Sequence, residues 1–231
     1  MKKWISLGMS LCVKAVALYN GSPSLPQIPE QNLFLAQDAL LSLKLSMLQD
    51  FIWSRNLDGL SDPAFHAAFS GGVITIGWID RVETYLLLGS ESFSLSGDSC
   101  LLKAHGSFGG EIGARATVIF WGDTKLSMDA KYAYLWPHLD SGGQGWQREW
   151  QVGVALGQEF AWFTPYLGVK YARMLMKLSS LPSLGTLLIN NTSPFGAFMG
   201  LSIAGRRGLF FDVEARFFDD NALALELGLR F

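Results

Sequence analysis

The sequence predicts an all-β protein: an antiparallel transmembrane β-barrel of about ten strands, of the outer-membrane type. Its bulk composition is the first observation behind this prediction. Hydrophobic residues make up 49% of the 231 residues, yet no run of about 18 apolar residues is present to form a membrane helix. The 16 Phe and 8 Trp favour alternating exposure of apolar side chains to lipid, because such barrels carry aromatic girdles at both lipid interfaces.

The last ten residues give the second observation. Residues 222–231 place leucine at every second position and end in Phe231. Strict period-two alternation is typical of a β-strand with one apolar and one polar face. In a membrane barrel the leucines would face lipid, and Glu226 and Arg230 would face the lumen. We predict that the terminal Phe231 is the C-terminal signal for insertion into the outer membrane. An edge strand of a soluble sheet is the alternative for this segment alone.

Nine further segments show the same alternation and complete the predicted barrel. They cover residues 41–53, 65–79, 82–94, 112–121, 125–135, 150–157, 163–174, 195–203 and 210–218. Their inward faces carry charges of both signs, and we predict that nine of these line the lumen: Lys44, Asp50, Arg115, Lys131, Lys170, Glu214, Arg216, Glu226 and Arg230. Such charges either tune a solute path or pair across the barrel as its polar core. Small inward residues, such as Gly113 and Gly168, are expected to leave space for water.

The connections between these segments are the third observation. Short connections are expected at 80–81, 122–123, 158–161 and 205–208, and long ones at 55–62, 95–107, 136–148 and 178–194. Short and long connections alternate along the chain. Outer-membrane barrels have short periplasmic turns and longer outer loops, so the pattern predicts that both ends of the barrel domain lie in the periplasm.

The first 38 residues are predicted to stand apart from the barrel. Residues 1–17 have a basic start, an apolar stretch and a small-residue cleavage site, which together are typical of a signal peptide. Residues 18–38 contain three prolines and little periodicity, which predicts an extended periplasmic leader. The barrel domain is then expected to cover residues 39–231.

Two cysteines are present in the chain. Cys12 lies in the predicted signal peptide, so Cys100 would be the only thiol of the mature protein. A single cysteine in an exported protein is either a free thiol or a partner in an intermolecular disulfide. We place Cys100 in the predicted loop 95–107, where a neighbouring protein could reach it.

Several segments resemble the chlamydial major outer membrane porin family. They are 49–55 (QDFIWSR), 73–83 (VITIGWIDRVE), 113–116 (GARA), 149–153 (EWQVG), 163–170 (FTPYLGVK) and 213–219 (VEARFFD). The resemblance follows the family's order along the chain and implies a porin that passes small solutes, assembles as a trimer and stiffens the envelope by disulfide cross-links. Family members are longer, cysteine-rich and built on about sixteen strands.

The sequence therefore favours a porin-like channel for passive diffusion of small solutes and ions in the bacterial outer membrane, with a contribution to envelope structure. A non-conducting structural or adhesive barrel is the alternative. A barrel enzyme is a distant third, because His66, His105 and His138 lack a catalytic motif, although His138 with Asp140 is a conceivable pair. The net charge of −2 gives no case for nucleic acid. The expected partners are membrane lipid, small solutes and ions, and further copies of the chain, and no cofactor is expected.

Overall fold

The computed structural model describes residues 41–231 except for 59–63, 79–80, 98–99, 182–184 and 206–207. The predicted signal peptide and the Pro-rich leader fall outside the described residues. Within the described residues, no helix is long and apolar enough to cross a membrane.

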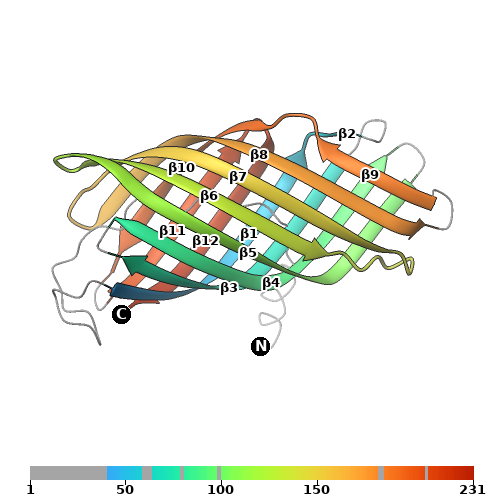
Figure 1. The fold of residues 1–231 in the computed structure, drawn as a ribbon, viewed down its shortest axis with the longest axis horizontal. Coiled ribbons are helices and arrows are strands. Elements are labelled where there is room, and N and C mark those ends of the chain that lie inside the picture. The colour runs from blue at the N-terminus through green and yellow to red at the C-terminus, as the bar shows by residue number, and fades with distance from the viewer. Residues whose placement is uncertain (1–40, 59–63, 79–80, 98–99, 182–184, 206–207) are drawn as a thin grey trace, which may run out of the picture.

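Antiparallel strands make up nearly all of the described chain (Figure 1). They are β1 (Leu41–Arg55), β2 (Leu57–Asp58), β3 (Ala64–Trp78), β4 (Val82–Gly97), β5 (Cys100–Trp121), β6 (Thr124–Trp136), β7 (Gln144–Gln158), β8 (Phe163–Leu181), β9 (Gly185–Asn191), β10 (Phe195–Ala204), β11 (Leu209–Phe217) and β12 (Asp220–Arg230).

Ten of these strands close into a barrel, which confirms the predicted fold class. The first and last strands meet, with Lys44 of β1 opposite Arg230 of β12. Neighbouring strands then pair in sequence order, except that β8 pairs with β10 rather than with β9 over its first half. The second half of β8 extends beyond β10 and pairs with β9, which in turn pairs with the two-residue β2. Every strand of the barrel wall therefore has a partner on both sides.

The predicted faces of the strands are confirmed by the alternation of buried and exposed residues. Met47 on β1 and Leu167 on β8 are more than 60% exposed, whereas their neighbours Lys44 and Lys170 are buried. The inversion of a soluble protein's pattern, with apolar side chains outside and charged ones inside, holds in the part of the barrel wall between the two aromatic girdles described below. Such a surface is stable only in lipid.

Two aromatic girdles border this apolar surface. Trp78, Trp121 and Trp162 are exposed at the end of the barrel that also holds the C-terminus, which we call the turn end. Trp53, Phe108, Trp136, Phe195 and Phe218 are exposed towards the opposite end, which we call the outer end because the topology predicted from the sequence places it outside the cell. Aromatic residues at both interfaces are typical of outer-membrane barrels, and the chain is a multi-pass barrel of that membrane.

The long connections predicted from the sequence are wrong in three places, because strands continue through them. β4 runs to Gly97 and β5 begins at Cys100, so the predicted loop 95–107 is part of two long strands. Similarly, β7 begins at Gln144 within the predicted loop 136–148, and the predicted loop 178–194 contains the end of β8 and all of β9. These extensions form a part of the barrel wall that projects beyond the outer girdle (Figure 1).

Inward glycines do not leave space for water, contrary to the expectation from the sequence. The ring of Tyr85 on β4 occupies the position where a side chain of Gly113 would lie, and the ring of Phe198 on β10 does the same over Gly168. Tyr166 covers Gly200 in the same way. Each glycine is a recess in one strand that an aromatic ring of the next strand fills, so these pairs pack the interior instead of opening it.

We predict that Gly113→Val destabilises the barrel by about 1–3 kcal/mol, because the new side chain must displace the Tyr85 ring from a packed interior. Ala114→Val is the matched control, since Ala114 is the next residue of β5 and is exposed on the lipid face. Urea unfolding of the refolded barrels, followed by heat-dependent gel mobility, measures both. Equal midpoints for the two variants would contradict the packing role of Gly113.

Candidate functional site in the barrel interior

The interior of the barrel is the candidate functional site, and it has three zones along the barrel axis. A charged cavity lies towards the turn end, an ion-pair network lies in the middle, and an apolar cluster lies towards the outer end. Long strands such as β1 contribute to all three zones, with Lys44 in the cavity, Asp50 in the network and Ile52 in the apolar cluster.

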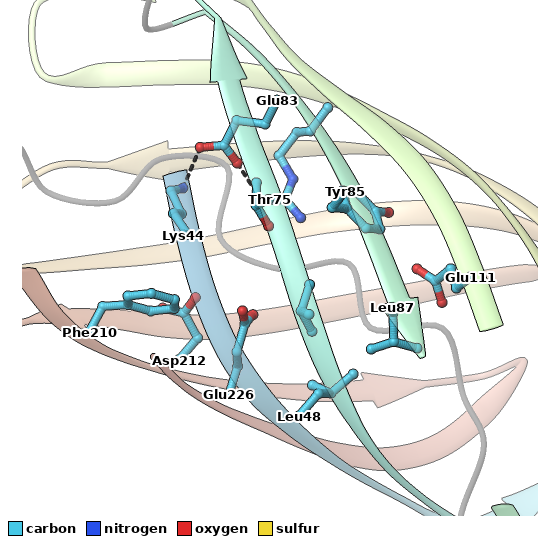
Figure 2. A pocket seen from close by; sticks show the side chains of 12 residues that line it. Lys44, Leu48, Thr75, Glu83, Tyr85, Leu87, Glu111, Phe210, Asp212 and Glu226 are labelled. Carbon is cyan, nitrogen blue, oxygen red and sulfur yellow. Dashed lines mark hydrogen bonds and ion pairs between the residues drawn. The ribbon is translucent and has the colours of Figure 1, made fainter. Parts of the chain in front are cut away.

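The cavity at the turn end combines charged and aromatic side chains (Figure 2). Lys44 on β1 forms an ion pair with Glu83 on β4, and Figure 2 shows the two side chains pointing at each other. Arg115 Nη1 lies 3.5 Å from Glu83 Oε2, and its Nε lies 3.8 Å from Asp129 Oδ2. The hydroxyl of Tyr85 donates to the same Asp129 carboxylate at 3.1 Å. Lys44 and Arg115 are therefore paired with carboxylates on nearby strands of the same wall.

The opposite wall of the cavity carries further acidic groups. Glu226 on β12 accepts a hydrogen bond from Ser46 at 2.5 Å, and Asp212 lies beside it on β11. The space open to water in this cavity is about 40 Å³, which holds roughly three water molecules. The cavity is too small to pass a hydrated solute.

The middle zone is an ion-pair network centred on Arg216, which is fully buried. Its Nη2 lies 2.5 Å from Asp50 Oδ1, and its Nε lies 3.7 Å from Asp220 Oδ2. Lys170 on β8 reaches across to the turn between β11 and β12, with its Nζ 2.8 Å from both Asp219 Oδ2 and Asp220 Oδ1. A buried charge needs a close partner to offset the loss of its hydration, and this network supplies one for each of its cations.

A second buried pair lies beside this network, since Arg55 of β1 is the cross-strand partner of Asp220 of β12. Arg55 forms a bidentate ion pair with Glu149 through both terminal nitrogens, with Nη1 2.8 Å from Oε2. Both side chains are almost fully buried. Glu91 is also buried, and among the described residues neither of its carboxylate oxygens has a hydrogen-bond partner. The ion pair of Arg55 with Glu149 joins β1 to β7 through the interior.

The outer zone is apolar, which the expectation of a polar lumen missed. Fifteen buried residues form one cluster: Ile52, Leu57, Phe65, Ala67, Ala68, Phe93, Leu95, Leu102, Ala104, Leu139, Met174, Met176, Leu178, Ile189 and Ala222. They come from β1 to β5, from β8, β9 and β12, and from the connection after β6. The rings of Phe65 and Phe93 stack with centroids 5.9 Å apart. The inside of the projecting wall is therefore packed like the core of a soluble protein.

All nine sequence-predicted lumen residues are buried or half-buried on the inward side of their strands. Eight of them have an ion pair or a hydrogen bond to an inward side chain: Lys44, Asp50, Arg115, Lys131, Lys170, Glu214, Arg216 and Glu226. The side chain of Arg230 is half-buried near the C-terminus. The interior also contains four charged residues that were not predicted from the sequence to line the lumen: Arg55, Glu149, Asp219 and Asp220. The inward position of Glu149 could have been predicted, since Glu149 stands two residues before Gln151 and therefore lies on the same face of the strand.

The histidines do not form the arrangement considered from the sequence. His105, rather than His138, lies beside Asp140, with its Nδ1 2.8 Å from Oδ2. Both side chains are about half exposed on the outer surface. No cluster of three or more His, Cys, Asp or Glu that could hold a metal ion occurs in the described part of the chain. Cys100 is the first residue of β5 and pairs with Gly97 across the hairpin, rather than lying in a long loop.

No protein-family model and no curated protein matches the chain. Among solved structures, the translocator domain of the autotransporter NalP from Neisseria meningitidis is 14% identical, with a TM-score of 0.47, over 84% of this chain and 89% of that one. The outer membrane protease OmpT from Escherichia coli is 9% identical, with a TM-score of 0.42, over 83% and 94%.

The transport unit of the autotransporter AIDA-I from Escherichia coli is 11% identical, with a TM-score of 0.36, over 86% of this chain and 93% of that one. Likenesses at this level carry no argument about function, and the fold assignment stands on the strand pairing described above.

We predict that Lys170→Met destabilises the barrel by about 3–5 kcal/mol, because it leaves two buried aspartates without their shared cation. Urea unfolding of the refolded protein measures the change. Adding Asp219→Asn to Lys170→Met should restore part of the lost stability, since the carboxylate that lost its ion pair with Lys170 is then removed, whereas Asp220 keeps its contact with Arg216. A double variant as unstable as the single one would argue against charge pairing as the cause.

Proposed function

We propose that this chain is a non-conducting outer-membrane barrel with a structural role in the envelope. The apolar cluster at the outer end carries this proposal. Water avoids a narrow passage lined by apolar side chains, and channels use such constrictions to stop ion flow by dewetting. Here the apolar zone is not a ring around a passage but a cluster in which Phe65, Phe93 and Met176 are each at most 1% exposed.

The ion-pair network, which lies between the apolar cluster and the turn end, also supports the proposal. A solute entering from the turn end would have to break the pairs of Arg216 with Asp50 and of Lys170 with Asp219 and Asp220. Breaking a buried pair costs several kcal/mol because each charge is left without a partner. The barrel is thus closed twice, by charge pairing and by apolar packing.

A diffusion channel for small solutes and ions is the second candidate. The observation that favours it is the charged cavity at the turn end, where Lys44, Glu83 and Arg115 surround a space that holds water. The resemblance to the chlamydial porin family implies the same activity. Conduction by this route would require both the ion-pair network and the apolar cluster to rearrange.

The conductance of the protein separates the two candidates. We predict that the refolded barrel, inserted into a planar lipid bilayer, gives no discrete current steps. Insertion is verified independently by reconstitution into vesicles and heat-dependent gel mobility. Reproducible steps from the unaltered protein would overturn the structural proposal and establish a channel.

A second experiment tests what closes the barrel. The double variant Phe65→Ser, Phe93→Ser places hydroxyl groups in the apolar cluster, and we expect sucrose-loaded vesicles carrying it to leak faster than those carrying the unaltered protein. Phe108→Ser is the matched control, since Phe108 is exposed on the lipid face. Leakage from the double variant that is no faster than leakage from Phe108→Ser would contradict closure by the cluster.

Cross-linking through Cys100 is part of the structural proposal. Cys100 begins β5 at the outer end, where a neighbouring envelope protein can approach the hairpin. We predict that non-reducing gels of envelopes show this chain in species of higher mass, that a reductant dissolves them, and that Cys100→Ser abolishes them. Unchanged species in the Cys100→Ser strain would remove the cross-linking role.

A further inference from the structure

Three cations gather on the outward face of β7 and β8, just beyond the outer aromatic girdle. Arg148 on β7 and Arg173 on β8 are exposed, and Lys177 on β8 is half-exposed. In the register of the two strands, Arg148 lies opposite Leu175, so Arg173 and Lys177 are its diagonal neighbours. Diagonal neighbours on one face of an antiparallel pair lie about 7–8 Å apart. We call these three residues the basic patch.

The basic patch lacks an anionic partner within the described part of the protein. No ion pair is formed by any of its three side chains there, whereas buried cations such as Lys44, Arg55 and Arg216 pair with carboxylates. The only carboxylate on β7 and β8 is Glu149, and it faces inward to Arg55. Like charges on neighbouring strands repel each other, so an external anion would stabilise this face.

The surroundings of the basic patch indicate what kind of anion fits. Arg148 lies over the ring of Trp146, 5.2 Å from its centroid. On the side towards the membrane, Trp150 lies opposite Arg173 and packs on Tyr171 with centroids 5.2 Å apart. Below these rings the same face carries Val152 and Val169, which are exposed to lipid. The patch therefore lies where the headgroups of the outer leaflet begin.

We propose that the basic patch binds the phosphate of an anionic lipid headgroup. Arg148 and Arg173 can each donate two parallel hydrogen bonds to phosphate oxygens, and Lys177 adds a third positive charge. The lipid tails would continue along the aromatic and apolar residues of the same face. This binding does not depend on whether the barrel conducts, because the patch faces away from the interior.

Lipid retention by the whole purified protein tests the proposal. The refolded barrel in neutral detergent micelles receives phosphatidylglycerol or phosphatidylcholine in increments, and native mass spectrometry counts the lipids that stay bound. We expect the unaltered protein to retain phosphatidylglycerol in preference. The variant Arg148→Gln, Arg173→Gln, Lys177→Gln should lose affinity by about fivefold per cation, on the order of a hundredfold in total. Its retention of phosphatidylcholine should not change.

The control variant is Arg81→Gln, Lys103→Gln, which removes two exposed cations that lie outside the patch. It should retain phosphatidylglycerol like the unaltered protein. Heat-dependent gel mobility verifies folding of every variant, and Arg148→Gln alone, with an expected loss of about fivefold, replaces the triple variant if that variant fails to fold.

Three outcomes would overturn the proposal. The first is equal retention of the two lipids by the unaltered protein, and the second is an equal loss of affinity in the control variant. The third is complete displacement of phosphatidylglycerol by inorganic phosphate at the same phosphate concentration, which would identify the patch as a site for soluble anions.

Discussion

Closure of the sheet is the constraint on which the rest of this structure depends. A strand in lipid cannot leave backbone groups unpaired, because no water is present to satisfy them. The pairing of β1 with β12 and the switch of β8 from β10 to β9 leave every strand of the wall with two neighbours. Once the sheet is closed, the side chains along each strand alternate between lipid and interior. The direction of one side chain therefore decides the directions of its neighbours on the same strand.

Closure also creates the electrostatic problem that the interior solves. A barrel of about ten strands has an interior only slightly wider than its side chains fill. The inward charges are therefore taken out of bulk water, and each must be offset by a close neighbour. Arg216 contacts Asp50 and Asp220, which belong to different strands, and Arg55 contacts Glu149 across the interior. The same contacts that make the charges tolerable also join strands far apart in the sequence.

The sequence predicts the strand faces well because lipid imposes a simple rule on them. In β1 and β12 the outward positions are apolar except for Gln49 and Asn221, so alternation alone assigns Lys44, Asp50 and Glu226 to the interior. It does not predict their partners, since those depend on the tilt and shear of the closed barrel. The aromatic–glycine pairs escaped prediction for the same reason: Tyr85 and Gly113 are on adjacent strands, and their register is not visible in either segment alone.

The missed strand extensions have a different cause. At the membrane boundary the apolar residues change from the outward positions of a strand to its inward positions, and we call this change the reversal. On β8, Leu167 and Val169 face outward within the lipid, whereas beyond the girdle Met174, Met176 and Leu178 face inward and Arg173 and Lys177 face outward. β4 reverses in the same way, with Leu86 and Leu88 outside and then Phe93 and Leu95 inside. A search for outward apolar residues stops where this reversal begins.

The reversal links the two proposals physically. Beyond the bilayer the wall is surrounded by water and headgroups, so its apolar residues must turn inward, where they fill the interior with the cluster around Phe65 and Phe93. Its polar residues must turn outward, which places Arg148, Arg173 and Lys177 at the height of the lipid phosphates. The apolar closure of the barrel and the basic patch on its surface thus meet on β8, where Met174, Met176 and Leu178 face inward and Arg173 and Lys177 face outward, and one change of solvent accounts for both faces.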